Sequence, residues 1–335
     1  MILDEPTNHL DTESIEWLES ELKTFYGTLM VISHDRYFLE NTVNKTLIVE
    51  HGTAKLYNAP YSKFTELRKA DQEYQMRCYQ QQQKEIARIE AIIENQRKWN
   101  REKNIVTAES WQKKLDKMEL VDKPDSDYTA PSIKFSVETL GGEDVLEVAG
   151  LGYSFPDRKL FENISFKIFR GDHTFIKGPN GCGKSTLLKV LTNNIPCQTG
   201  TFKFGHNIKW SYYSQDFSDL NTENTVLDEV FEYANKRYFT EHTGKKDFHP
   251  LLEIRNSLAA FGFTGEDVFK KISVLSGGEK ARVALLKISY DNASVLILDE
   301  PTNHLDIQSR EVLEDALLKF EGTIIAVSHD RYVAS

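Results

Sequence analysis

The segment GPNGCGKS at 178–185, followed by Thr186, constrains the fold more than any other part of the chain. It fits G-x-x-x-x-G-K-[ST], in which glycines let consecutive backbone N–H groups turn toward a phosphate. Apolar residues on both sides predict a strand before the loop and a helix that begins at it. The sequence therefore predicts an α/β domain of the P-loop type, doubly wound around a mostly parallel sheet.

We expect this loop to bind the phosphates of ATP. Lys184 is placed to reach the β- and γ-phosphates, and the Ser185 hydroxyl is placed to hold Mg²⁺. The remaining candidates for phosphate contact are Gly178, Pro179, Asn180, Gly181, Cys182, Gly183 and Thr186. A glycine-rich turn that binds nothing is the alternative, but the strand and helix signals around the loop disfavour it.

Two stretches of the chain occur twice. ILDEPTNHLD at 2–11 returns at 297–306, and SHDRY at 33–37 returns at 328–332, both at an offset of 295 residues. An ungapped repeat of this kind indicates two copies of one fold module. No phosphate loop precedes the first copy, and the second stops just after SHDRY. We therefore expect the chain to be an incomplete piece of a longer protein.

The repeated stretches carry candidate catalytic groups. VLILDE at 295–300 predicts a buried strand ending in Asp299, placed to hold Mg²⁺, and Glu300, placed to activate the attacking water. His329 follows a second apolar strand and is expected to contact the γ-phosphate or the water. A lone histidine is more often a surface or capping residue, but this one recurs in an identical pentapeptide. The matching residues of the first copy are Asp4, which is also a magnesium candidate, Glu5 and His34.

LSGGEKARVAL at 275–285 is the third motif. Ser276, Gly277 and Gly278 open a predicted helix, so free N–H groups and the positive end of the helix dipole can face an anion. Glu279 completes the SGGE signature. Alone, these residues could form only a helix cap. Their place between a phosphate loop and a strand that ends in carboxylates favours contact with ATP.

Together these motifs resemble the ATP-binding cassette superfamily, and the doubled NHLD and SHDRY resemble its F subfamily of cytosolic twin-cassette ATPases, many of which act on the ribosome. The resemblance implies that Gln215 senses Mg²⁺ and the γ-phosphate and that Phe155 stacks on adenine, with Tyr153 as the second choice. A core aromatic remains open for either ring, and a surface glutamine for Gln215. Asp306 and Asp11 match the loop where two cassettes touch.

In this family two cassettes pair head to tail, and each ATP lies between one phosphate loop and the other cassette's SGGE. The first copy here has neither motif, so neither composite site can be complete within one chain. The resemblance therefore implies ATP and Mg²⁺ binding at the second cassette, with weak ATP hydrolysis by this chain alone. The partner cassette would come from the missing part of the protein or from a second copy.

A charged segment separates the two copies. Residues 61–123 lack glycine, have a net charge of +3, and carry apolar residues at helical spacing, which predicts an antiparallel helical hairpin. Its expected tip gathers Arg97, Lys98, Trp99, Arg101 and Lys103, which suit RNA contact. A solvated hairpin with Trp99 packed on a helix is the alternative, but the family's linker reaches toward tRNA and rRNA. We thus expect a first-cassette remnant at 1–60, a linker at 61–131 and a second cassette at 132–335.

Composition limits the remaining possibilities. The chain shows no apolar run long enough to span a membrane, no signal peptide and three scattered cysteines, which together predict a cytoplasmic protein. Its net charge of −10 argues against a globally basic nucleic-acid binder. The alternatives left open are a transporter subunit, a DNA-repair or chromosome ATPase, and a non-catalytic interaction protein. The sequence does not separate antibiotic resistance from a general role in translation.

Overall fold

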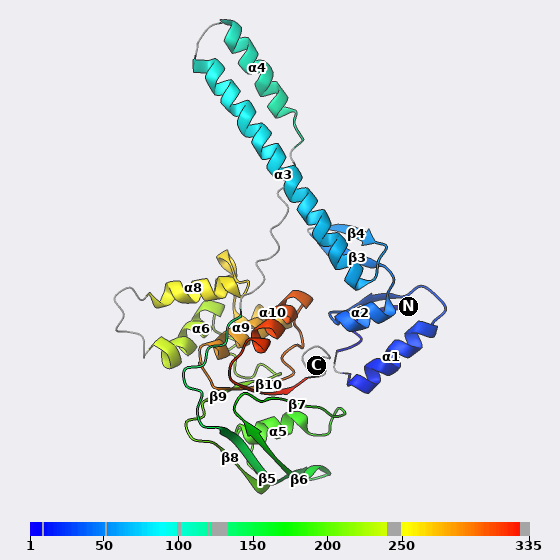
Figure 1. Ribbon diagram of the computed structural model, residues 1–335, viewed down its shortest axis with the longest axis vertical. Helices are drawn as coiled ribbons and strands as arrows, with labels where there is room; N and C mark the ends of the chain where they lie inside the picture. Colours follow the sequence, from blue (N-terminus) through cyan, green and yellow to red (C-terminus); the bar gives the residue numbers. More distant parts are fainter. Residues whose placement is uncertain are drawn as a thin grey trace. The chain divides into compact units, whose positions relative to one another are not determined.

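The structure, a computed structural model, describes residues 1–8, 10–50, 52–98, 102–119, 121, 133–239 and 249–328 (Figure 1). It divides into two compact units, one formed by Met1–Thr42 with Thr129–Ser335 and the other by Val43–Tyr128. The domain boundaries predicted from the sequence stay predictions, and residues 131–132 lie outside the described part of the chain.

The centre of the first unit is a four-stranded parallel sheet in the order β7 (His173–Ile176), β11 (Thr323–Val327), β10 (Val295–Asp299) and β9 (Trp210–Tyr213). Every residue of β10 and β11 is buried, as expected for inner strands of a parallel sheet. The order differs from the sequence order, so the connections cross over the sheet. This confirms the predicted α/β class with a mostly parallel sheet.

Helices cover both faces of this sheet. Ile297 and Ile325 pack in one apolar cluster with helix α5 (Lys184–Leu191). Leu296 and Ile324 face the opposite way and pack with helices α9 (Gly277–Ser289) and α10 (Ile307–Leu318). The alternation follows from the two-residue period of a strand. Because the apolar residues face both ways, the phosphate-loop helix and the SGGE helix lie on opposite faces.

A second, antiparallel sheet lies beyond α5 (Figure 1). Its order is β6 (Arg158–Phe169), β5 (Asp144–Phe155) and β8 (Thr199–Phe204). Val148 and Leu151 of β5 share the apolar cluster of α5. The helix that follows the phosphate loop is therefore held between two sheets.

Helices form the lobe predicted between Gln215 and SGGE. It contains α6 (Val226–Ala234), a π-helical turn (Asn235–Phe239), α8 (Pro250–Ala260) and two 3₁₀ turns, Gly265–Phe269 and Ile272–Val274. Their buried apolar residues join the cluster that also packs on α9.

The first copy of the repeat forms β1 (Ile2–Asp4), α1 (Thr12–Thr24), β2 (Met30–Ile32) and α2 (Arg36–Thr42). Strands β1 and β2 pair in parallel with Asp4 opposite Ile32. Asp299 lies opposite Val327 at the same repeat positions. The identical register of the two strand pairs confirms that the repeated sequence stretches fold in the same way.

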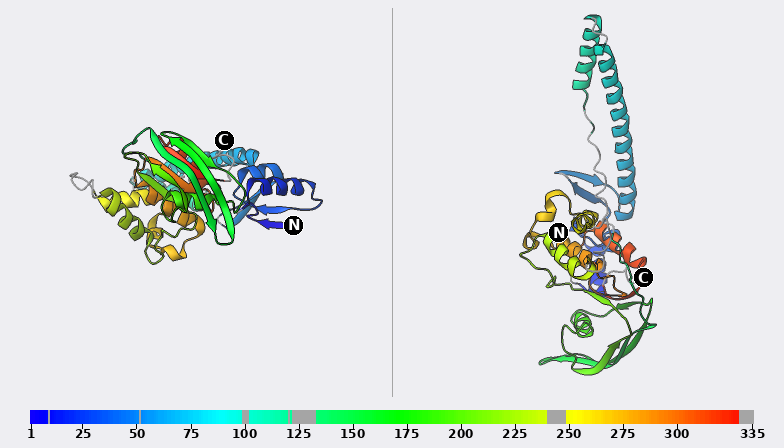
Figure 2. Two further views of the ribbon diagram at one scale, coloured as in Figure 1. Left: turned by 90° about the horizontal axis from the view of Figure 1, so that it is seen from below. Right: turned by 90° about the vertical axis from the view of Figure 1, so that its left-hand side faces the viewer.

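The second unit begins with an antiparallel pair, β3 (Thr46–Glu50) and β4 (Thr53–Tyr57). Two helices follow side by side, α3 (Tyr61–Lys98) and α4 (Glu102–Asp116) (Figure 2). Ile89, Ile93 and Ala108 are buried between them, with Trp111 and Leu115 packed alongside. The 38 residues of α3 correspond to about 57 Å at 1.5 Å per residue. The predicted helical hairpin is thus present.

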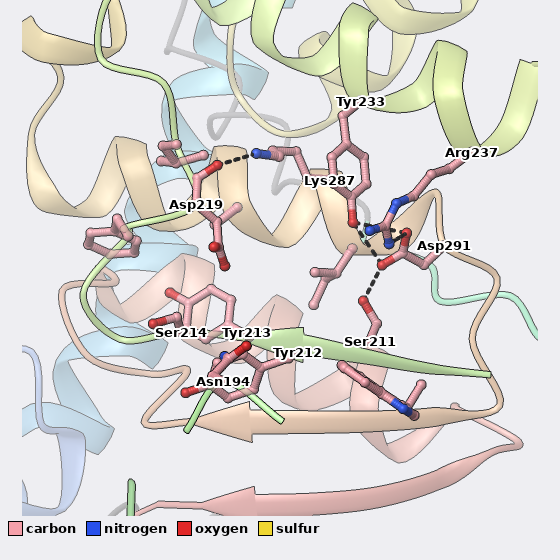
Figure 3. A pocket seen from close by; sticks show the side chains of 15 residues that line it. Asn194, Ser211, Tyr212, Tyr213, Ser214, Asp219, Tyr233, Arg237, Lys287 and Asp291 are labelled. Carbon is pink, nitrogen blue, oxygen red and sulfur yellow. Dashed lines mark hydrogen bonds and ion pairs between the residues drawn. The ribbon is translucent and has the colours of Figure 1, made fainter. Parts of the chain in front are cut away.

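A cavity of about 400 Å³ lies beside the edge strand β9, under helices α6 and α9 (Figure 3). Tyr233, Arg237 and Ser211 converge there on the buried carboxylate of Asp291. None of the residues of the phosphate loop lines this cavity. It is therefore separate from the predicted ATP site.

Lys287, which lines this cavity, forms a buried ion pair with Glu229. Lys287 Nζ lies 2.6 Å from Glu229 Oε1 and donates a second hydrogen bond, of 2.8 Å, to the carbonyl of Asp219. Both charged side chains are less than a tenth exposed. Such a pair adds little net stability, because the cost of desolvating both charges offsets their attraction. Lys287 thus ties the SGGE helix to α6 and to the loop after Gln215.

Candidate nucleotide-binding site

The candidate residues meet at one edge of the parallel sheet. Asp299 lies opposite Val327, Val327 lies opposite Ile176, and Leu298 lies opposite Tyr213. Because the strands are parallel, the segments that follow them lie side by side at their carboxyl ends. The phosphate loop, the two carboxylates and Gln215 are therefore neighbours, and His329 follows Val327 but lies outside the described residues.

The phosphate loop needs glycine at two positions. Gly181 and Gly183 have φ angles of 77° and 104°, in the region that side chains disfavour. A Cβ atom at Gly183 would also lie 3.0 Å from the ring of Phe161. Gly183 precedes α5 and provides no side-chain cap, so the first N–H groups of the helix remain available to an anion.

The two polar residues that begin α5 are already held in place. Lys184 Nζ donates hydrogen bonds to the carbonyls of Gly178 and Pro179, at 2.7 and 3.1 Å. Ser185 Oγ donates to Asp299 Oδ1 at 2.9 Å. The ammonium group thus lies over the loop, and the serine hydroxyl lies against the carboxylate of the neighbouring strand.

Asp299 is 2% exposed, and burial raises its pKa, while the hydrogen bond from Ser185 opposes that shift. A buried carboxylate beside a hydroxyl is a set of oxygen donors that a hard divalent cation prefers. Ser185 and Asp299 therefore fit magnesium, and Asp4 holds the same strand-end position in the first repeat.

Glu300 and Glu5 share an unusual backbone conformation. Their φ angles are 50° and 43°, in the left-handed region that non-glycine residues seldom adopt. The N–H of Glu300 donates to the carbonyl of Val327 at 2.9 Å, and that of Glu5 donates to Ile32 at 2.8 Å. Such conformations persist where the surroundings impose them, and they cluster at functional sites. Both carboxylates are consequently held at the end of their strands.

The first repeat brings its two candidate catalytic residues together. The Nε2 atom of His34 lies 3.5 Å from Glu5 Oε1, and its backbone N–H donates to Glu5 Oε2 at 3.4 Å. A histidine beside the carboxylate is the arrangement that the repeated motif predicts for the γ-phosphate end of a site.

The NHLD loop, residues 8–11 in the first repeat and 303–306 in the second, links the two repeats: in the first repeat it contacts the phosphate loop of the second cassette. Asp11 caps α1 through the N–H of Ser14, and its other oxygen accepts from the N–H of Asn180 at 3.3 Å. Asp306, at the same repeat position, caps α10 through the N–H of Ser309 at 2.7 Å. One repeat therefore contributes a side chain to the phosphate loop of the other.

The SGGE motif opens α9 with a reciprocal cap. Ser276 accepts from the N–H of Glu279, and the Glu279 carboxylate accepts from the N–H of Ser276. A Cβ atom on Gly278 would lie 2.7 Å from the carbonyl oxygen of His304, and Gly277 also faces His304. The glycines thus let the helix start lie close against the NHLD loop of its own repeat.

The candidates for adenine and γ-phosphate contact differ in exposure. Phe155 ends β5, is 50% exposed, and meets Tyr153 edge to face at 5.4 Å between ring centroids. Tyr153 packs against the apolar cluster of α5, which leaves Phe155 as the more accessible ring. Gln215 is half-buried just beyond β9. The pKa of the next residue, Asp216, is lowered mainly by the hydrogen bond from the Ser214 hydroxyl.

At the expected hairpin tip, Lys98 is 66% exposed and lies 3.0 Å from Glu94 Oε1. Trp99 and Arg101 lie outside the described residues, as do the side chains of Arg97 and Lys103. Their predicted contact with RNA stays a prediction.

The structure adds two arginines to which the sequence analysis assigned no role. Arg310, on α10, donates to the carbonyl of His34 at 3.1 Å. Arg36, directly after SHD in the first copy of SHDRY, lies 2.7 Å from Glu314 Oε2. The offset of the repeat could have drawn attention to Glu314, because Glu19 occupies the same position in the first repeat.

Comparisons with known proteins find sequence matches over nearly the whole chain. The sequence pattern of a family described as ABC transporter matches residues 161–303, and a second pattern described in the same words matches residues 47–135. The protein YdiF of Bacillus subtilis is 40% identical over 333 residues, covering 99% of this chain and 50% of that protein.

Two further relatives carry more specific names. ABC transporter F family member 5 of Arabidopsis thaliana is 37% identical, covering 99% of this chain and 46% of that protein. The ribosome protection protein VmlR of Bacillus subtilis is 35% identical, covering 99% of this chain and 62% of that protein. The chain thus spans about half the length of the curated relatives it matches.

Among the described residues, no helix combines the length and the apolar character needed to cross a membrane. The phosphate loop at 178–185 and the SGGE signature at 276–279 both lie within the matched range 161–303. The chain belongs to the ATP-binding cassette family, in its F type.

Proposed function

We propose that the whole protein is a twin-cassette ATPase in which ATP binding closes the two cassettes and hydrolysis reopens them. One observation carries the proposal. The Ser185 hydroxyl donates a hydrogen bond to Asp299 at the strand ends. Asp11, from the other repeat, accepts a hydrogen bond from the backbone N–H of Asn180 in the same phosphate loop. A site built from two repeats closes only when both are in contact, which links nucleotide binding to cassette movement.

The second site would use the groups at the strand ends. Lys184 and the loop N–H groups bind the phosphates, Phe155 stacks on adenine, and Gln215 and His329 contact the γ-phosphate end. Glu300 accepts the proton of the attacking water. Ser185 and Asp299 would hold Mg²⁺, which would supply positive charge against the phosphates.

The first site would use the matching residues Asp4, Glu5 and His34. Its phosphate loop belongs to a part of the cassette that this chain does not contain, and Ser276–Glu279 would face that loop from the second cassette. The phosphate loop at 178–186 would be faced by the SGGE motif of the first cassette. A second copy of the chain could supply that motif instead.

Removing magnesium is expected to weaken ATP binding to this chain about tenfold, because the buried Asp299 carboxylate then faces the triphosphate without a neutralising cation. Isothermal titration with ATP and magnesium should give one nucleotide per chain, and EDTA should raise the dissociation constant. The Asp299→Asn variant is the control, since its affinity should no longer depend on magnesium. Equal affinity of the unmodified chain with and without EDTA would count against the assigned magnesium ligands.

The partner we propose is the ribosome, with the α3–α4 hairpin reaching tRNA or rRNA. Support comes from the name of VmlR, a ribosome protection protein similar over nearly the whole chain, and from the cations at 97–103 in a chain of net charge −10. Phosphate contact by Arg and Lys suits such a tip, and Trp99 suits stacking on a base.

Replacing Arg97, Lys98 and Arg101 by alanine is expected to weaken ribosome binding about tenfold and to flatten its dependence on salt, because three phosphate contacts are lost. Binding would be measured by co-sedimentation at several salt concentrations. The matched control replaces Arg77, Lys84 and Arg88, which lie on the same helix α3 away from the tip. Equal losses in both triple variants would mean that the tip has no special role.

A further inference from the structure

One guanidinium group joins the two repeats. Arg310, in the first turns of α10, donates through Nε to the carbonyl of Leu305 at 3.0 Å. Through NH1 it donates to the carbonyl of His34 at 3.1 Å. Leu305 belongs to the NHLD loop of the second repeat, and His34 belongs to the SHDRY of the first. The planar fork of arginine thus fixes two main-chain groups relative to each other.

A second arginine strengthens this link from the other side. Arg36, two residues after His34, donates to both carboxylate oxygens of Glu314 at 2.9 and 2.7 Å. It also donates to Glu311 at 2.9 Å. Arg36 and Glu314 are 18% and 15% exposed, so water screens this pair less than an open surface pair. The segment that carries His34 is therefore held to α10 at two points.

Helix α10 is in turn anchored to the second cassette. Asp306 caps it, and Arg282 NH1 of the SGGE helix lies 3.7 Å from the same carboxylate. The chain of contacts therefore runs from α9 through the NHLD loop and Arg310 to His34. At its end, His34 lies beside Glu5. One side chain, that of Arg310, therefore joins the NHLD loop of the second repeat to His34.

The repeat makes this link one-sided. At the offset of 295 residues, Glu311 and Glu314 correspond to Glu16 and Glu19, but Arg310 corresponds to Ile15. Ile15 is 6% exposed and has no side-chain donor. Arg310 of the second cassette thus holds a main-chain carbonyl of the first site. Ile15, at the matching position of the first cassette, cannot make the equivalent hydrogen bond.

We propose that Arg310 is a positioning residue for His34, so that the second cassette controls the geometry of the first ATP site and the two sites are not equivalent. This rests on the proposed ATPase function. Loss of the clamp would let the histidine shift while the nucleotide contacts stay, and misplaced groups slow chemistry more than they weaken binding.

The test uses the whole twin-cassette protein with one site silenced at a time. In the Glu300→Gln background only the first site turns over, and Arg310→Ile, which installs the residue of the other repeat, should lower kcat about tenfold with KM for ATP unchanged. In the Glu5→Gln background only the second site turns over, and Arg310→Ile should change kcat less than twofold. Arg310→Lys keeps the charge and a donor but not the forked guanidinium. In the Glu300→Gln background its kcat should lie between that of the protein with Arg310 and that of the Arg310→Ile variant.

Two controls separate positioning from stability. In a His34→Ala background, whose second site still turns over, Arg310→Ile should cause no further loss, whereas a general structural defect would add to it. Lys319→Glu alters the exposed charge pair that Lys319, directly after α10, makes with Asp315, and it should leave both sites unchanged. If neither silenced background hydrolyses ATP, the proposed function fails. If both do and Arg310→Ile affects neither site, or affects both equally, the positioning role is wrong.

Discussion

Replacing Lys184 by alanine is expected to raise the dissociation constant for ATP at this site at least about a hundredfold. Two loop carbonyls hold the Lys184 ammonium over the phosphate loop, at 2.7 and 3.1 Å. The charge is therefore already in place before the phosphates arrive, and little ordering is required on binding. Its loss removes the cation that the loop itself carries toward the β- and γ-phosphates.

The measurement is isothermal titration of the chain with ATP and magnesium. Lys167→Ala is the matched control, because Lys167 is exposed on β6 and pairs with Glu147 at the surface. That variant should bind ATP like the unmodified chain. Similar weakening by both replacements would show that the loop is not where ATP binds.

Changing Glu5 and Glu300 together to glutamine is expected to lower ATP turnover of the whole protein at least about a hundredfold while ATP stays bound. The amide has the shape of the carboxylate but cannot accept the proton of the attacking water. The left-handed φ angles of 43° and 50° should persist, since the backbone hydrogen bonds that fix them do not involve the side chains.

Turnover and retention of labelled nucleotide would be measured in parallel. The control is Glu13→Gln with Glu266→Gln, which changes two exposed carboxylates, one in the first repeat and one in the helical lobe. It should leave both quantities unchanged. Normal turnover by the Glu5→Gln, Glu300→Gln protein would remove both residues from the catalytic step.

Much of the site follows from local patterns. Two apolar strands at 295–299 and 323–327, each followed by polar groups, already imply a shared strand-end edge, and the register of Asp299 with Val327 agrees. The phosphate-loop motif predicts glycine at position 183 because the loop requires a local backbone turn. The φ angle of 104° at Gly183 is that turn. The hairpin was predicted because apolar spacing along α3 and α4 is also a local property.

The contacts between distant positions could not be predicted in this way. Arg310 lies on a helix whose pattern allows any polar residue at its position, and its partners are backbone carbonyls, which leave no trace in a sequence. Lys287 is similar, because a lysine on an amphipathic helix is normally solvated, yet here its charge is buried against Glu229. Such contacts depend on tertiary packing, which periodicity does not encode.

The most direct test of the whole account is sedimentation of ribosomes with the whole protein carrying Glu5→Gln and Glu300→Gln. With ATP the variant should pellet with ribosomes and stay bound, because the cassettes close and cannot reopen. With ADP, or after a further Lys184→Ala change, it should remain in the supernatant. Equal amounts in the pellet with ATP and with ADP would contradict nucleotide-controlled ribosome binding.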